Sequence, residues 1–458
     1  MAILLAPNGW YAGHAVRRCV LAACTLLATW HGKGAMAQGL WEPAPEGPVG
    51  GWLEVDEGWE EPVDVVPWGS GGFAIGLNVY GELGVPEPRL VRADVAGIKG
   101  TCVLAPEGTI GGMAAGDAGG VWVVWNAGTL STTAPEGSAQ TAVLGYFPSE
   151  LTNTTGIPAP SAGPVLCAWA TPWSEAEAVV ATEDGGALVV GWGLDPCCAH
   201  RELPFFWKVR ADGSPDPGFG WGGVSVVDVA EATTIRPPGN TYHEALDSPA
   251  QRHDIGGFFS SITPFQGGWV AGGGYSTGSA YELMLVCIDA TGQLDSAFGD
   301  EGIVRLNAFP GMSHFVDDVI SEAGQLVSLV AVPPNAETES RCVAWVVQAS
   351  GESVGWEEAP LPGFRADRWE RAHGMLWATG LSPEGNRHVP SGMLWRGGFA
   401  APTRWSLSHS RSATRMRSAW HPDLAMLATV VQLSGGLPTE SDWGLRAWSP
   451  WVPDMLHK

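Results

Sequence analysis

A serine inside the pattern G-x-S-x-G is the feature of this 458-residue sequence that most directly suggests catalysis. The pattern runs from Gly274 to Gly278, with Ser276 at its centre. In hydrolases such a serine lies on a strained turn between a strand and a helix. Here apolar, strand-like sequence lies on both sides and no helical pattern follows. We therefore expect an ordinary connection between two strands.

Two acidic segments contain side chains that could bind a metal ion. The segment 230–256 holds carboxylates and imidazoles at Glu231, His243, Glu244, Asp247, His253 and Asp254. Their spacing matches no compact metal motif, and a polar surface loop explains them. A second group, formed by Asp289, Asp295, Asp300 and Glu301, lacks the alternating register of a calcium loop. Turn capping explains this group. The sequence identifies no catalytic residue, cofactor-binding residue or metal ligand.

The N-terminus has the features of an export signal. The basic pair Arg17-Arg18 precedes an apolar run over residues 19–30, and a small-x-small site ends at Ala37. We predict that residues 1–37 are a signal peptide cleaved near Ala37. The first fifteen residues are long for a basic region, so translation from Val16 is an alternative. The mature protein is then secreted, periplasmic or attached to the cell envelope.

Export would decide how many cysteines the mature protein has and whether they can form disulfides. Cleavage removes Cys19 and Cys24, and six remain at Cys102, Cys167, Cys197, Cys198, Cys287 and Cys342. An even number in an exported chain permits disulfides, but the adjacent Cys197 and Cys198 would be strained as a pair. Zinc bound by Cys197, Cys198 and His200 is disfavoured, since no second cysteine pair follows at zinc spacing. Buried thiols are the alternative for Cys167, Cys287 and Cys342.

The strongly acidic composition restricts the partners. The net charge is −24, and residues 1–37 carry three basic residues and no acidic one, so the mature chain is more acidic still. Nucleic acids and anionic membrane surfaces are bound through clustered Lys and Arg, so we expect neither as a partner. No other long apolar run suggests membrane insertion. We expect a monomer that binds an unknown protein or glycan.

An unusual turn occurs twice, as ADGSPDPGFGWGG over residues 211–223 and DATGQLDSAFGDEG over 289–302. Matching positions such as Phe219 and Phe298 are 79 residues apart. Gly213 and Gly292 fit a turn that needs positive φ, and Asp216 and Asp295 can accept backbone hydrogen bonds two residues further on. The repeat is therefore predicted to serve packing.

Around these turns a larger unit recurs seven times. Apolar strands opened by glycine are predicted near 73–76, 121–124, 187–191, 269–272, 326–330 and 375–379, with a degenerate seventh copy near 425–429. Seven copies over residues 38–458 give a repeat of about sixty residues, which suits four-stranded propeller blades with long loops. The fold class is predicted to be all-β, a seven-bladed β-propeller of mostly four-stranded antiparallel blades closed by N- and C-terminal strands. The chain has 24 Trp, and we expect core positions for those within apolar strands, at Trp122, Trp207, Trp269, Trp345, Trp377 and Trp395.

The pattern DG-x-x-D-x-x-FG-x-x-G after a GG-apolar strand resembles the delta-60 repeat of exported bacterial proteins. Two copies are clear, at about 185–225 and 267–306. The resemblance implies a β-propeller-like exported bacterial protein. It transfers no catalytic residues, because that family has none assigned.

The ends and the insertions complete the predicted organisation. We expect a loose leader over 38–48 and a single propeller domain over 49–458. Residues 51–56 are predicted to pair with 443–449 or with a neighbouring strand of the same blade, and so close the ring. Trp41, Trp52 and Trp59 lie in an acidic, Pro-rich segment and are expected to be more exposed than the strand tryptophans. The insertions 147–165, 193–204 and 230–256 are expected to be surface loops that carry recognition.

The leading functional hypothesis is a non-enzymatic binding or scaffold propeller of unknown ligand. One alternative is a hydrolase or lyase with a site at the mouth of the central channel. A structural component of the cell envelope is the other. Carboxylates or histidines with shifted pKa values in the channel would favour the enzyme.

Overall fold

The computed structural model describes short segments at the N-terminus and most of the chain from residue 59 to 450. The described residues are 20–22, 41–43, 52–54 and 59–450, except 82–83, 95–96, 118, 129–139, 150–161, 167–173, 196–197, 236–255, 277–280, 308–315, 323, 333–340, 359–364, 373–374, 385–386, 397–402, 407–412, 422–425 and 435–440. These residues form strands and turns, with no α-helix among them. The prediction of an all-β chain is confirmed.

The strands form seven antiparallel sheets of four or five strands, which we number in chain order. Sheet 1 contains β4 (Trp59–Trp68), β5 (Gly72–Tyr80), β6 (Pro86–Asp94) and β7 (Gly97–Val103). Sheet 2 contains β8 (Gly108–Ala115), β9 (Val121–Gly128), β10 (Gln140–Phe147) and β11 (Ala162–Leu166). Sheet 3 contains β12 (Ser174–Ala181), β13 (Ala187–Asp195), β14 (Cys198–Val209), β15 (Val224–Asp228) and β16 (Thr233–Ile235).

The next three sheets repeat the plan of four strands in chain order. Sheet 4 contains β17 (Gly257–Phe265), β18 (Gly268–Ser276), β19 (Tyr281–Ile288) and β20 (Ile303–Leu306). Sheet 5 contains β21 (Val316–Glu322), β22 (Gln325–Val332), β23 (Arg341–Gln348) and β24 (Ser353–Glu358). Sheet 6 contains β25 (Arg365–Ala372), β26 (Met375–Glu384), β27 (Arg387–Arg396) and β28 (Thr403–Ser406).

Sheet 7 joins the two ends of the chain. It contains β29 (Ala413–His421), β30 (Met426–Ser434) and β31 (Ser441–Pro450), with β2 (Trp41–Pro43) as its outer strand. A separate two-stranded sheet pairs β1 (Val20–Ala22) with β3 (Trp52–Glu54). Six of the seven predicted strands fall within the second strands of sheets 1 to 6, and the seventh, 425–429, coincides with β30 from Met426 onward.

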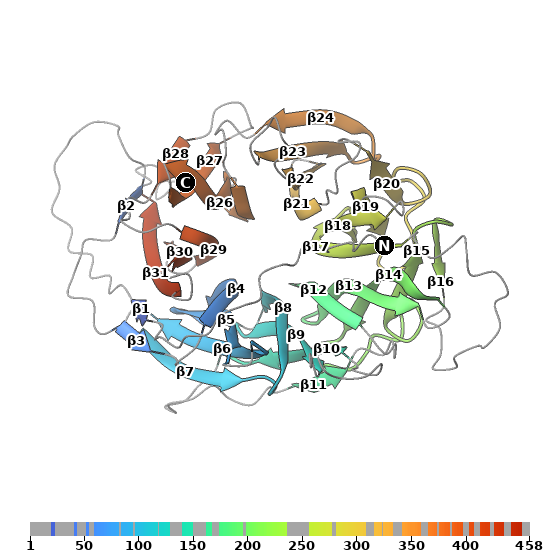
Figure 1. The fold of residues 1–458 in the computed structure, drawn as a ribbon. Helices are drawn as coiled ribbons and strands as arrows, with labels where there is room; N and C mark the ends of the chain where they lie inside the picture. The colour runs from blue at the N-terminus through green and yellow to red at the C-terminus, as the bar shows by residue number, and fades with distance from the viewer. Residues whose placement is uncertain are drawn as a thin grey trace, which may run out of the picture.

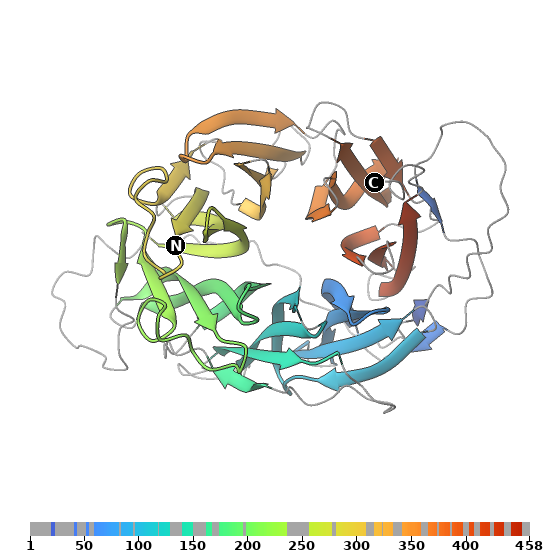
Figure 2. The ribbon, with the colours of Figure 1, turned by 180° about the vertical axis from the view of Figure 1, so that it is seen from behind.

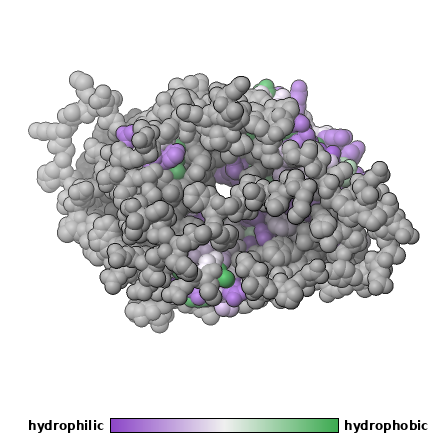
Figure 3. Space-filling model, viewed as in Figure 1, coloured by the Kyte–Doolittle hydropathy of each residue, from purple (hydrophilic) through white to green (hydrophobic). Residues whose placement is uncertain are grey.

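The seven sheets stand radially around a centre, which is the arrangement of a β-propeller (Figure 1). The view from behind shows the same succession from blue to red (Figure 2). The first strands lie innermost, and each contacts the next in the order β4, β8, β12, β17, β21, β25 and β29; β29 in turn contacts β4. The space-filling view shows an opening at the centre, with hydrophilic surface inside it (Figure 3).

The hydrophobic core lies between neighbouring sheets. Trp122 of sheet 2 packs in one cluster with Val189 and Trp207 of sheet 3, and all three are buried. The second strand of each sheet is hydrogen-bonded to a strand on both sides and is covered by a neighbouring sheet on each face. Its sequence is therefore a largely apolar run. In β5 the first eight residues are all buried. Another cluster joins Phe73 of sheet 1 to Ala419 of sheet 7, so apolar packing also connects the last sheet to the first.

The repeated turn has the packing role predicted for it. Gly213 and Gly292 have φ of 81° and 82°. The Asp216 and Asp295 side chains each accept a hydrogen bond at 3.0 Å from the backbone N–H two residues further on. Phe298 is buried, as is its counterpart Phe219.

The same turns also connect neighbouring sheets. The Gly220 N–H of sheet 3 donates to the Thr291 carbonyl of sheet 4 at 2.7 Å, and Gly299 of sheet 4 donates to the Ser350 carbonyl of sheet 5 at 2.8 Å. A side chain at Gly292 would contact the Phe219 ring at 3.0 Å, so glycine is needed there for close approach. The motif recurs because it holds consecutive sheets together.

The pairing of the N-terminal strand differs from the prediction. Residues 41–43 pair with β31, Trp41 opposite Pro450 and Pro43 opposite Trp448, whereas residues 52–54 pair with β1. The sequence of 51–56 predicts a strand without a blade of its own, which is why it is the expected partner. An outer strand, however, needs hydrogen bonds along one side only and tolerates a proline. Residues 41–43 within the predicted loose leader are therefore strand.

The three insertions also differ from the prediction. Residues 193–204 were expected to form a loop, but they extend β13 and β14 into a long hairpin in which Asp195 pairs with Cys198. Backbone hydrogen bonds hold this hairpin together. Its polar sequence therefore lacks the apolar pattern from which a strand is predicted. Residues 162–166 form β11 and 233–235 form the added fifth strand β16. The rest of these two insertions, 150–161 and 236–255, lies outside the described residues.

Candidate functional site in the central channel

Each of the seven first strands carries a β-bulge at the same place. The register against the second strand shifts by one residue in every sheet. The extra residues are Val63, Gly111, Glu177, Ser260, Asp317, Asp367 and Thr414. A bulge leaves one residue without a partner in the ladder and re-aims its neighbours. Because the first strands surround the opening, the seven bulges lie around the channel.

Several polar side chains at the bulges have structural roles. Asp64 accepts hydrogen bonds from the N–H of Val65 at 2.9 Å and, across the sheet boundary, from the N–H of Met113 at 3.1 Å. Ser260 donates to the carbonyl of Val316 in the next sheet. Asp64 and Ser260 therefore connect neighbouring sheets.

The backbone of β12 is held by a clamp from sheet 2. The Asn126 amide oxygen accepts from the Ala176 N–H at 2.8 Å, and its amide nitrogen donates to the Ala176 carbonyl at 3.1 Å. Gly111 approaches so closely that a side chain there would lie 1.9 Å from the Ala176 carbonyl oxygen. These contacts hold the backbone of Ala176, which lies between Glu175 and Glu177, in one position. A reactive side chain needs a backbone fixed in this way.

Glu177 has the most strongly perturbed carboxyl group among the described residues. It is the extra residue of the β12 bulge and is half-buried. Burial and the negative charge of Glu175 raise the pKa of Glu177 to about 7, against a hydrogen bond from the Trp192 side chain that lowers it. A carboxyl group with a pKa near neutrality can donate or accept a proton at the pH at which most proteins work.

A second polar pair lies where sheets 3 and 4 meet. The Tyr281 hydroxyl donates to a Glu202 carboxylate oxygen at 3.1 Å. Burial raises the pKa of Glu202, and burial together with Glu202 raises that of Tyr281 to about 12. A hydroxyl that holds its proton so firmly is a weak acid and is hardly ever ionised near neutral pH, so we assign this pair to packing.

The structure explains several of the side chains considered as candidates. Gly274 to Ser276 end β18, and β19 begins at Tyr281, so the G-x-S-x-G motif runs from strand to strand as expected. Asp289 accepts hydrogen bonds from the backbone of Thr291 at 2.8 Å and of Gln293 at 3.0 Å, which is the predicted turn capping. Thr277 and Gly278, and the loop residues His243, Glu244, Asp247, His253 and Asp254, lie outside the described residues. Among the residues described, no group of three or more His, Cys, Asp or Glu lies close enough to hold a metal ion.

The cysteines and tryptophans are described in part. Cys287 is a buried free thiol, as the alternative to disulfides predicted, and Cys102 is free and half-buried. Cys167 and Cys197 lie outside the described residues, as do the side chains of Cys198 and Cys342. Trp122, Trp207 and Trp345 are buried and Trp269 partly buried, in agreement with their predicted core positions. The side chains of Trp41, Trp52, Trp59, Trp377 and Trp395 are not described.

Glu177 was not predicted from the sequence, although a signal is present. The strand was recognised only as AVVA over residues 178–181, while the structure extends it back to Ser174. Glu175 and Glu177 are two residues apart, and a regular strand places such residues on the same face. Two like charges side by side at the start of an inner strand are unusual. The bulge itself has no residue signature.

Comparison with known proteins identifies the fold only. No protein-family model matches the chain, and no curated protein matches it. Among solved structures, the chain is similar to polysaccharide lyase Uly1, with 12% identity, a TM-score of 0.50, and coverage of 84% of this chain and 90% of that one. It also resembles the phage phi92 endosialidase, with 8% identity, a TM-score of 0.44, and coverage of 88% and 71%.

A third structure is the β-propeller domain of the Trilobed protease from Pyrococcus furiosus. It has 9% identity, a TM-score of 0.43, and coverage of 85% and 93%. No helix in the described part of the chain is long and apolar enough to cross a membrane.

Proposed function

We propose that this protein is a hydrolase or lyase of an extracellular polymer, with Glu177 in the central channel as its acid–base group. The observation that carries the proposal is the position of Glu177. It is the extra residue of a bulge in an innermost strand, clamped from sheet 2, with a pKa raised to about 7. The sequence alone favoured a non-enzymatic binding propeller; a perturbed carboxyl group at the channel favours the enzyme.

The supporting scaffold is proposed to be a seven-bladed ring closed by β2 on β31. Three observations support closure: the contact of β29 with β4, the apolar cluster that joins Phe73 to Ala419, and the pairing of Trp41–Pro43 with β31. A closed ring leaves few unpaired sheet edges. It also surrounds the channel, so that water and substrate reach Glu177 through the two mouths.

The chemistry would proceed in one of two ways. In hydrolysis, the protonated Glu177 gives its proton to the leaving oxygen, the bond to that oxygen breaks, and water adds its oxygen to the other fragment; the proton that this water loses returns to the Glu177 carboxylate. In a lyase reaction, the Glu177 carboxylate takes a proton from carbon, the carbon–oxygen bond breaks, and a carbon–carbon double bond forms without water; the proton then passes from Glu177 to the leaving oxygen. Both reactions suit a carboxyl group that is part protonated near neutral pH.

Export supports an extracellular substrate. The predicted signal over residues 1–37 and the resemblance to delta-60 repeat proteins indicate a secreted, periplasmic or envelope-associated bacterial protein. A glycan is the proposed substrate class, a protein the second choice, and the acidic chain is proposed to act as a monomer. The strand β1 lies inside the predicted signal peptide, so the β1–β3 pair would be absent from the mature protein.

Incubation of the mature chain, residues 38–458, with extracellular polymers tests this function. The panel contains neutral and acidic polysaccharides, peptidoglycan and a protein. We expect at least one polymer to be shortened. New reducing ends with near-ultraviolet absorbance from a double bond would indicate a lyase, and reducing ends alone a hydrolase. If every polymer keeps its length, the proposed function is wrong.

A further inference from the structure

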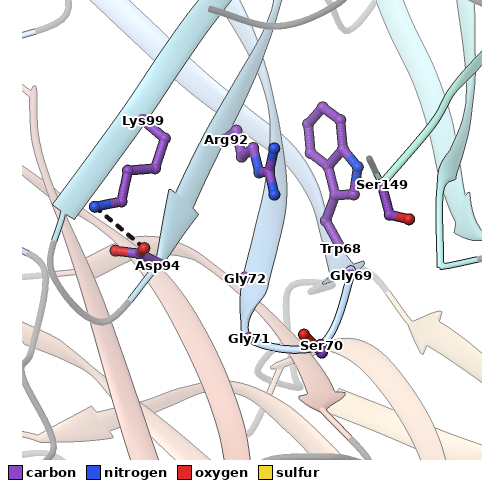
Figure 4. A pocket seen from close by; sticks show the side chains of 9 residues that line it. All are labelled: Trp68, Gly69, Ser70, Gly71, Gly72, Arg92, Asp94, Lys99 and Ser149. Atoms are coloured by element: carbon purple, nitrogen blue, oxygen red, sulfur yellow. Dashed lines mark ion pairs between the residues drawn. The ribbon is translucent and has the colours of Figure 1, made fainter. Parts of the chain in front are cut away.

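A polar pocket lies outside the channel, where sheet 1 meets sheet 2. The turn from Trp68 to Gly72 forms one side, and Arg92 and Asp94 at the end of β6, Lys99 of β7 and Ser149 form the rest (Figure 4). Its volume is about 320 Å³. This is at the lower end of the range found for small-molecule sites, roughly 300–1,000 Å³.

Of the two cations in the pocket, Lys99 forms an ion pair and Arg92 stacks on an aromatic ring. The Lys99 ammonium lies 3.1 Å from an Asp94 carboxylate oxygen. The Arg92 guanidinium lies over the Trp68 ring, 5.2 Å from its centre, and the buried indole of Trp68 donates to the Pro148 carbonyl at 3.2 Å. Within the described residues Arg92 forms no ion pair. This cation is therefore fixed by stacking, with its hydrogen-bond donors available to the pocket.

The corresponding position in sheet 3 shows what such a cation requires. In sheets 1 and 3 two glycines open the second strand, at Gly71-Gly72 and Gly185-Gly186. The residue two places after the second glycine pairs with the cation: Ala74 with Arg92, and Leu188 with Lys208. The Lys208 ammonium is neutralised twice. It lies 3.4 Å from an Asp184 carboxylate oxygen and 3.0 Å from one of Asp216.

Sheet 1 lacks both of these carboxylates. The residue before the two glycines is Asp184 in sheet 3 but Ser70 in sheet 1. Asp216 belongs to the long repeated turn between β14 and β15, whereas in sheet 1 only two residues separate Asp94 at the end of β6 from Gly97 at the start of β7. The short connection leaves the pocket in front of Arg92.

We propose that this pocket binds the oxyanion of a small ligand, which takes the place of the two carboxylates around Lys208. A carboxylate, sulfate or phosphate group fits the planar donor fork of arginine. The Ser70 and Ser149 hydroxyls line the same space and can donate as well. The site is independent of Glu177, so it can be present whether or not the channel is catalytic.

Calorimetric titration of the mature chain at constant ionic strength tests the site. The probes are inorganic sulfate, inorganic phosphate and glucuronate, with glucose as the neutral control. We expect one-to-one binding of at least one oxyanion and none of glucose. Arg92→Gln should weaken it about tenfold, since a charge-assisted hydrogen bond is lost. The matched control Arg210→Gln removes an exposed arginine from a turn of sheet 3 and should leave binding within about twofold.

A second variant tests the comparison between the sheets directly. Ser70→Asp restores the carboxylate found beside Lys208, so it should weaken oxyanion binding by at least about tenfold while raising the melting temperature. The oxyanion with the highest affinity among the three shows whether the natural ligand carries a sulfate, a phosphate or the carboxylate of an acidic sugar. The proposal is overturned if none binds, if Arg92→Gln and Arg210→Gln weaken binding equally, or if Ser70→Asp leaves it unchanged.

Discussion

Glu177→Gln should lower the turnover of the cleaved polymer by about 10²–10⁴-fold, the contribution usual for a general acid or base. The amide keeps the shape of the side chain but neither gives nor takes the proton. The control Glu183→Gln removes a carboxylate from an exposed turn of the same sheet and should keep full turnover. Turnover of Glu177→Gln within a few-fold of the parent would remove Glu177 from the mechanism.

The same variant should be more stable than the parent at high pH. The folded protein raises the pKa of Glu177 from 4.5 to about 7, so folding is favoured while the group is protonated and loses this advantage as the pH rises through about 7. The melting temperature of Glu177→Gln should therefore exceed that of the parent at about pH 8 and equal it at about pH 4. This readout separates loss of the proton donor from misfolding.

Removal of residues 38–45 from the mature chain should destabilise the protein by about 2 kcal/mol and promote aggregation, because three paired residues are lost and β31 becomes an open edge. These residues include β2, which pairs with Ser449 through Glu42. Removal of 38–40 alone leaves β2 in place and should have little effect. Urea unfolding and light scattering measure both outcomes. If the two truncations unfold alike, β2 does not close the ring.

The second strands were predictable from sequence, and the reason is physical. A strand covered on both faces is apolar at most positions, so runs such as that of β5, in which Asn78 is the one polar side chain before Tyr80, are visible after their opening glycines. The repeated turn was equally clear, since Gly292 needs positive φ and Phe298 a buried site. Local constraints of this kind leave a direct trace in the residue types.

The inner and outer strands left a weaker trace. A bulge needs no particular residue, and the seven extra residues range from Gly111 to Glu177. The outer strand β2 is three residues long and is held by backbone hydrogen bonds, so its sequence does not mark it as a strand, and the prediction of 51–56 in its place is wrong. Both features depend on partners far away in the chain.

The two candidate sites also arise from distant contacts. The pKa of Glu177 depends on its burial in the folded protein and on the charge of Glu175, and Asn126 of sheet 2 fixes the β12 backbone beside it. The pocket at Arg92 results from what sheet 1 lacks compared with sheet 3, namely the carboxylates of Asp184 and Asp216. No single segment of the sequence contains either property.

The pH dependence of kcat/KM on the cleaved polymer tests the central claim most directly. We expect one limb of the profile with a midpoint near 7, the pKa of Glu177. In Glu175→Gln the like charge that raises this pKa is gone, so the midpoint should move to lower pH. A profile without a limb near 7, or a midpoint that stays in place in Glu175→Gln, would contradict the assignment of Glu177 as the acid–base group.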